Sequence, residues 1–276
     1  MKKKRIPLGL IILLLFVLII GIFYAYNKYY FPNAKAYAKY IETYQEYDSN
    51  EISEINIDSI NHKVIIKPSE DGKVKITYFQ KNDNMNMYTL ENGKIRMELI
   101  ENVEDLDTLL FKTEKKIDTI TIYLPVENSI KVNVAASYGN LEIYDISLST
   151  ISFKNTIGNI KLKNIACTTI TVDLNTGNAD MEHIKFDQLS TKIVSGNINV
   201  QSEEMIEQYN LAVKAIYGTL QFNDKQLFSE EQPESVINEI EQFKSDTDKK
   251  IAIEILRGNI KLNFKENISD NENKEN

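Results

Sequence analysis

The sequence predicts an all-β protein, a single-stranded parallel β-solenoid with about 19 residues per coil. A Gly-Asn pair recurs every 19 residues, and the apolar residues between the pairs alternate with polar ones. A unit of this length cannot bury its apolar side alone, so successive units must stack. The pairs are Gly139-Asn140, Gly158-Asn159, Gly177-Asn178 and Gly196-Asn197, followed later by Gly258-Asn259.

The units fall into apolar columns when they are aligned on their glycines. The second residue after each glycine is Leu141, Ile160, Ala179 or Ile198, and the fourth is Ile143, Leu162, Met181 or Val200. A period of two is typical of strands with one buried face. Gly and Asn both tolerate the positive φ that a tight corner requires. Stacked Asn side chains, about 4.8 Å apart, could also form a hydrogen-bonded ladder, and a simple turn role is the alternative.

The same register continues towards the carboxyl end of the chain. Gly218 follows Gly196 after a short insertion, and Gly258 follows after a longer one. We therefore expect an extracytoplasmic solenoid domain over residues 51–264, in which residues 223–249 form an inserted loop or a short helix. The helical alternative rests on the spacing of Val236, Ile237, Ile240 and Phe243. Residues 265–276 are polar, which predicts a disordered tail.

The amino-terminal segment predicts a membrane anchor. Three lysines and an arginine at positions 2–5 precede an uncharged apolar run over residues 6–26, about the length that crosses a bilayer. The positive charges place residues 1–5 in the cytoplasm and the main domain outside. The expected location is therefore the cell membrane, in a single-pass topology. A cleaved signal peptide is the alternative.

Residues 27–50 are expected to form a short juxtamembrane helical stalk. Tyr37, Tyr40, Tyr44 and Tyr47 would lie on one stripe of such a helix. This stripe is the candidate contact surface for a protein partner or a sugar. The alternative is a stalk helix that packs over the start of the β domain.

Composition and residue counts argue against several classes of function. The net charge is −8, from 32 basic and 40 acidic residues, which disfavours nucleic acid as a partner. Cys167 is the only cysteine and shares an apolar column, so we expect a core residue and no disulfide. With only His62 and His183, a multi-histidine metal site is impossible. No cofactor or metal is expected.

Candidate catalytic residues also have a structural explanation in the repeat. Ser195 occupies the variable position before a glycine, and His183 aligns with Asp145 and Asn164 at a turn. A triad of Ser195, His183 and either Asp180 or Asp173 is therefore disfavoured. A carbohydrate-active enzyme on a β-helix would need clustered carboxylates. The aspartates of the coils, Asp173, Asp180 and Asp187, fall in different columns.

The coils resemble the bacterial putative-adhesin domain family of unknown function, a group of cell-envelope β-solenoid proteins. The residues that carry the resemblance are Ser195-Gly196-Asn197-Ile198-Asn199-Val200 and the copies that begin at Tyr138, Ile157, Thr176 and Arg257. The resemblance covers roughly residues 52–264. It implies a β-solenoid without known catalysis in the envelope of Gram-positive bacteria, with a role in adhesion or in sensing envelope damage. It implies no functional residues.

Together these observations predict a membrane-anchored, extracytoplasmic and non-catalytic module for binding, scaffolding or envelope-stress sensing. Its expected partner is a membrane or envelope protein. A surface adhesin is the first alternative, and a carbohydrate-active enzyme is the second.

Overall fold

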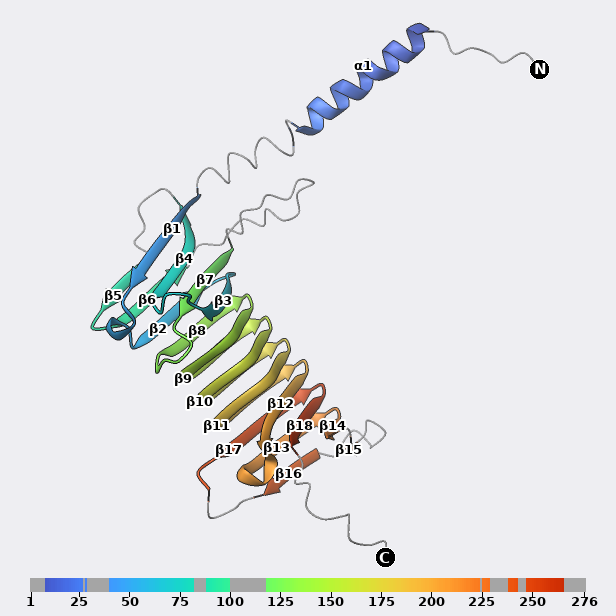
Figure 1. Cartoon of the computed structure of the whole chain (residues 1–276). Coiled ribbons are helices and arrows are strands. Elements are labelled where there is room, and N and C mark those ends of the chain that lie inside the picture. Colours follow the sequence, from blue (N-terminus) through green and yellow to red (C-terminus); the bar gives the residue numbers. More distant parts are fainter. Residues whose placement is uncertain are drawn as a thin grey trace, which may run out of the picture.

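The computed structural model describes residues 8–26, 28, 40–81, 88–99, 118–223, 225–228, 238–242 and 247–265. Figure 1 shows helix α1 (Leu8–Ala25) and a long stack of strands. All the strands belong to a single mixed sheet that folds around the core. The predicted all-β class is confirmed.

The predicted membrane anchor is wrong. Helix α1 (Leu8–Ala25) contains 18 residues, fewer than the 21 residues of the apolar run over positions 6–26. Within the described part of the chain, no helix has both the length and the apolar character needed to span a membrane. This finding overturns the single-pass location expected from residues 6–26.

Three consecutive strands form the regular centre of the stack. They are β9 (Leu141–Ile157), β10 (Ile160–Thr176) and β11 (Ala179–Ser195), each 17 residues long. β10 pairs in parallel with both neighbours, and Ile160 lies opposite Leu141 on one side and Ala179 on the other. Each strand is thus one coil of the solenoid. It bends where Asp145, Asn164 and His183 adopt φ values of 54°, 55° and 53°.

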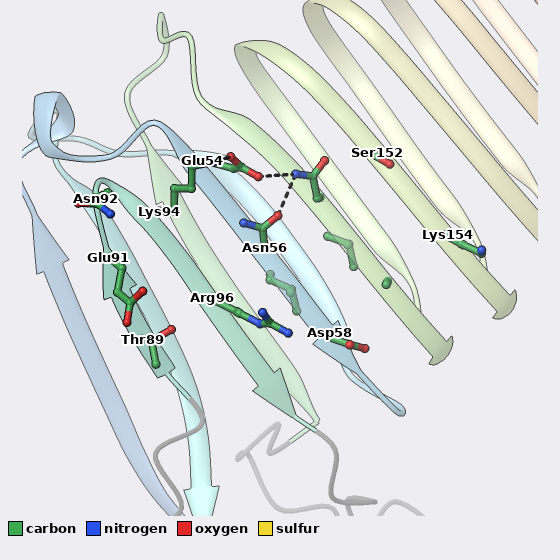
Figure 2. A pocket seen from close by; sticks show the side chains of 14 residues that line it. Glu54, Asn56, Asp58, Thr89, Glu91, Asn92, Lys94, Arg96, Ser152 and Lys154 are labelled. Atoms are coloured by element: carbon green, nitrogen blue, oxygen red, sulfur yellow. Dashed lines mark hydrogen bonds and ion pairs between the residues drawn. The ribbon is translucent and has the colours of Figure 1, made fainter.

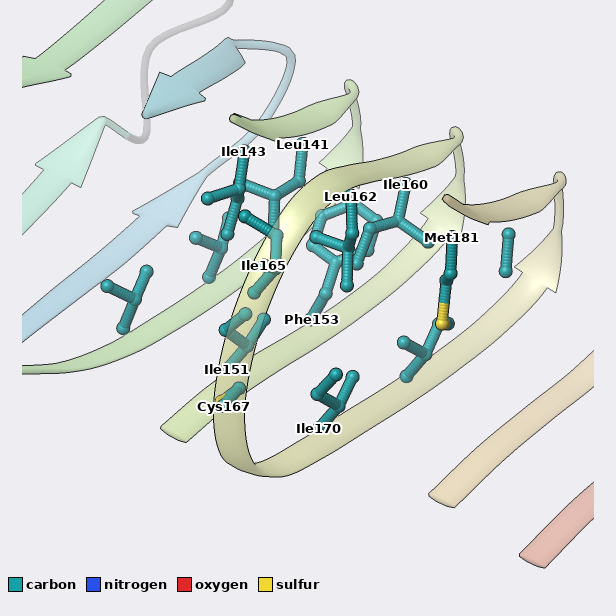
Figure 3. Close-up of a cluster of buried hydrophobic side chains, with 14 of the residues drawn as sticks. Leu141, Ile143, Ile151, Phe153, Ile160, Leu162, Ile165, Cys167, Ile170 and Met181 are labelled. Carbon is teal, nitrogen blue, oxygen red and sulfur yellow. The ribbon is translucent and has the colours of Figure 1, made fainter. Parts of the chain in front are cut away.

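The core fills the space between the two halves of each coil. Figure 3 shows Ile160 and Leu162 from the first half of β10 facing Ile170 from its second half. Alternate residues along each strand are buried, and Leu162 and Ile170 are both 0% exposed. Burial of these apolar side chains is the main favourable contribution to folding. The intervening residues face outwards.

The first coil of the chain is not the first coil of the stack. Five strands build this end: β2 (Glu54–Ser59), β3 (Lys63–Pro68), β6 (Lys94–Leu99), β7 (Thr119–Leu124) and β8 (Lys131–Tyr138). β2 pairs in parallel with both β6 and β8, and β3 pairs in parallel with both β7 and β9. The coil formed by β2 and β3 is therefore inserted between coils that follow it in the sequence.

The carboxyl end repeats this arrangement. Its strands are β12 (Ile198–Met205), β13 (Asn210–Tyr217), β14 (Leu220–Phe222), β17 (Lys250–Arg257) and β18 (Ile260–Lys265). β17 lies between β11 and β13, and β18 lies between β12 and β14. Gly258 consequently stacks on Gly196, one coil before Gly218. The 19-residue period does not reveal this order, because it identifies coils without identifying their neighbours.

Antiparallel strands complete the sheet at both ends, so the expected purely parallel solenoid is wrong. They are β1 (Tyr40–Tyr47), β4 (Val74–Lys81), β5 (Tyr88–Glu91), β15 (Lys225–Phe228) and β16 (Asn238–Gln242). At the amino end β4 pairs with β7, β1 with β4, and β5 with β6. At the carboxyl end β15 pairs with β14 and β16 with β13. An antiparallel return needs only a short turn, and it covers an open edge of the parallel stack.

Two expected helices are strands instead. Tyr40–Tyr47 forms β1 rather than part of a helical stalk, because its Tyr, Ile and Thr residues suit a strand and pair with β4. Asn238–Gln242 forms β16 rather than a helix, and Ile240 packs against the core. Tyr37, Val236, Ile237, Phe243 and residues 266–276 lie outside the described residues. Short 3-10 turns occur at Ser49–Glu51 and Ile206–Gln208.

Ile253→Asp tests the register of the last coil, which buries one face of β17. Ile253 is 2% exposed in β17, which has a strand on either side. The substitution removes a packed side chain and buries a carboxylate, so the free energy of unfolding should fall by about 4 kcal/mol or more in urea denaturation. Glu254→Gln, on the exposed face of the same strand, should stay within about 0.5 kcal/mol. Equal losses for the two variants would contradict this register.

Candidate functional site

The recurring glycines are required by a close approach between coils. A Cβ atom on Gly177 would overlap the carbonyl oxygen of Gly158, and one on Gly196 would overlap the carbonyl oxygen of Gly177. Gly177 and Gly196 also have positive φ, of 149° and 156°. Any other side chain would force these backbones apart, so this column serves the fold.

The Asn residues form a ladder along the same corner. The Oδ1 atoms of Asn140, Asn159 and Asn178 accept the backbone N–H of the next Asn at 2.8, 2.8 and 2.9 Å. The side-chain amides of Asn159, Asn178 and Asn197 donate to the same oxygens at 3.2–3.3 Å. Asn259 and then Thr219 continue the ladder. These Asn residues do not adopt positive φ, contrary to expectation; the bend residues do.

The tyrosine stripe is divided between two faces. Because Tyr44 and Tyr47 are three residues apart on a strand, their side chains point in opposite directions. Tyr44 is 52% exposed and its hydroxyl donates to Glu46. Tyr47 instead stacks on Tyr88 with ring centroids 6.3 Å apart. The stripe expected from a helix is therefore not one continuous surface.

The structure does not bring Ser195, His183 and Asp180 together. Asp180 Oδ1 accepts a hydrogen bond from the Asn199 amide at 2.8 Å, and the His183 ring lies 3.5 Å from Glu203. Cys167 is 6% exposed, and burial raises the pKa of its thiol to about 11. A thiol in this state is a weak nucleophile at neutral pH. It is a core residue, as its column predicts.

A polar trough on the outer face of the second half of the coils is the main candidate site. It begins as a hollow of about 830 Å³ lined by β5, β6, β2, β8 and β9. A second hollow of about 440 Å³ continues it across β9, β10 and the end of β11, and the two share Asp58, Ala135 and Lys154. Figure 2 shows its polar side chains projecting from neighbouring strands.

Hydrogen bonds order one end of the polar trough. The Asn133 amide donates to Asn56 Oδ1 at 2.9 Å and to Glu54 Oε1 at 3.2 Å, and Lys94 Nζ lies 2.9 Å from Glu54 Oε2 (Figure 2). The hydrogen bond from Lys94 lowers the pKa of Glu54, so this carboxyl stays ionised. The trough therefore presents preformed donors and acceptors.

Sequence reasoning missed the polar trough because its walls come from distant segments. β2, β6 and β8 become neighbours only through the inserted first coil. The sequence does show a polar residue at every second position of β2, namely Glu54, Asn56 and Asp58. It does not show which strands lie beside β2. Any outward-facing strand position would carry the same signal.

His62 is buried at the corner beneath Gly139 without a hydrogen-bond partner for its Nδ1 atom. It is 4% exposed, and a Cβ on Gly139 would overlap its carbonyl oxygen. Burial lowers the pKa of His62 to about 4, against a small opposing effect of Asp118. The folded protein therefore holds this ring neutral.

The model of the family described as Toastrack DUF4097 matches residues 52–230. No curated protein matches the chain.

Two solved structures are among the similar folds. A putative cell adhesion protein from Clostridium sporogenes is 16% identical, with 82% of this chain and 100% of that chain covered and a TM-score of 0.44. A putative adhesin from Bacteroides fragilis is 11% identical, with 82% and 97% covered and a TM-score of 0.41.

The buried His62 predicts a stability loss in acid. The unfolded chain takes up the proton near pH 6.5 and the folded chain only near about 4, so stability falls as the pH falls between these values. The contribution is about 3 kcal/mol. When unfolding is measured at pH 7 and again at about pH 4, the wild type should lose about 3 kcal/mol more stability than His62→Leu does. Identical profiles for His62→Leu and the wild type would refute the assignment.

Proposed function

Because this chain belongs to the Toastrack DUF4097 family, we propose that it is a non-catalytic binding protein that presents the polar trough to an extended ligand at a cell surface. The observation that carries this proposal is the trough itself. It crosses adjacent strands on a face whose side chains are not needed for the core.

The dimensions of the polar trough suit a chain-like ligand. The strands β6, β2, β8, β9, β10 and β11 are successive neighbours at this face. At about 4.8 Å per strand spacing they extend over about 24 Å. An extended polymer of several units can occupy such a surface, and its polar groups can meet the amides, hydroxyls and charges along it.

The arrangement of carboxylates favours binding over hydrolysis. Asp58 and Asp173 both line the polar trough, but they are three strand spacings apart, about 14 Å, whereas glycosidase carboxylates are about 5–9.5 Å apart. Glu98 lies only one strand spacing from Asp58, but it is held in an ion pair with Arg96. Glu54 is already engaged by Lys94 and Asn133. Among the residues that the structure describes, no cluster of three metal-ligating His, Cys, Asp or Glu side chains occurs.

Within this class, ligand binding or scaffolding fits the geometry better than envelope-stress sensing. A sensor needs an element with two conformations that the signal can bias. The polar trough is instead a preformed surface whose Asn56 and Asn133 amides are already fixed by hydrogen bonds. Adhesion to a neighbouring cell is the second candidate, because the polar trough is exposed along several neighbouring strands.

Blocking the polar trough tests this function. Beads coated with the full-length protein should adhere to isolated bacterial cell walls or to cultured epithelial cells. Ala135→Trp, at an exposed position in the middle of the trough, should reduce bead retention about tenfold. Lys163→Trp, on the opposite outer face, should not reduce it. Equal retention of all three proteins would contradict the proposal, and cleavage of a wall glycan or peptide would contradict its non-catalytic part.

A further inference from the structure

One row of residues crosses the polar trough along the stack and carries a charge on almost every strand. The paired residues are Glu98, Asp58, Ala135, Lys154, Asp173, Lys192, Glu254 and Lys214, in the order of the strands. Ala135 is the one uncharged residue in this row. It lies where the two hollows of the trough overlap.

Ala135 leaves a gap between opposite charges. Asp58 is its partner on β2 and Lys154 is its partner on β9. The two flanking strands are separated by two strand spacings, about 10 Å. The methyl group of Ala135 cannot fill the space between them, and this residue is exposed. A ligand can therefore approach the sheet here with one charged end at each side.

The charges on either side of the gap differ in sign. Glu98 lies next to Asp58 on β6 and forms an ion pair with Arg96, whose Nε lies 2.7 Å from Glu98 Oε1. Lys154 stands on the other side of Ala135. A cationic group is favoured near Asp58, and an anionic group is favoured near Lys154.

We propose that the gap over Ala135 binds a linear zwitterionic ligand, with its ammonium group at Asp58 and its carboxylate at Lys154. This inference rests on the binding function proposed for the polar trough and assigns the chemistry of its central part. An extended peptide spans about 3.3–3.6 Å per residue, so the termini of a tripeptide are about 10 Å apart. This length matches the separation of the two flanking strands.

Three related peptides test the proposal on the full-length protein by ligand-observed saturation-transfer NMR. Triglycine carries both charges, N-acetyl-triglycine lacks the ammonium group, and triglycine amide lacks the carboxylate. Triglycine should bind, and each blocked peptide should bind about fivefold more weakly, the range expected for loss of one exposed ion pair. Equal binding of the three peptides, or no binding of triglycine, would overturn the proposal.

Substitutions of Asp58 and Lys154 test which charged group of the peptide each residue binds. Asp58→Asn should weaken triglycine but leave N-acetyl-triglycine unchanged, and Lys154→Gln should weaken triglycine but leave triglycine amide unchanged. Ala135→Leu should weaken triglycine by filling the gap, whereas Lys163→Gln on the opposite face should have no effect. If Ala135→Trp abolishes bead adhesion while triglycine does not bind, the zwitterion assignment fails and the binding function stands. If substitution of Ala135 changes neither bead adhesion nor triglycine binding, both proposals fail.

Discussion

The structure depends on one close approach, in which the carbonyl oxygen of each corner glycine lies where the next glycine would carry a Cβ atom. This contact lets neighbouring coils pair in register through the corner, and the Asn ladder fixes them there with hydrogen bonds from Asn159, Asn178 and Asn197. Because strand register also decides which residues face outwards, the corner determines the positions of both the core columns and the polar trough.

The inserted coils connect this register to the candidate function. β2 contributes Glu54, Asn56 and Asp58 to the polar trough, and it does so because it lies between β6 and β8. The insertion also places His62 beneath Gly139, so the same coil that forms one wall of the trough carries the buried histidine. At both ends antiparallel strands cover the parallel stack, which limits pairing with other chains at its open edges.

The sequence predicted the features that repeat and missed those that depend on distant neighbours. Alternating residues such as Ile160, Leu162 and Ile170 identified the core, because burial of one strand face leaves a period of two. The family match over residues 52–230 confirms the resemblance drawn from the Gly-Asn coils. The helix expected around Tyr44 and Tyr47 was wrong, since pairing with β4 overrides a short helical spacing. The trough could not be predicted, because polar residues on β2 do not indicate that β6 and β8 flank them.

The central claim, that close packing of the glycine column sets the register, is tested most directly by comparing Gly177→Ala with Gly72→Ala in urea denaturation. Both glycines have positive φ, but a Cβ on Gly72 would have nothing within 4 Å, whereas one on Gly177 would overlap the Gly158 carbonyl oxygen. Gly72→Ala should cost about 1 kcal/mol from backbone strain alone. Gly177→Ala should cost about 3 kcal/mol or more, because the coils must separate. Similar losses for the two variants would show that the turn conformation, and not the approach of the coils, accounts for the repeated glycine.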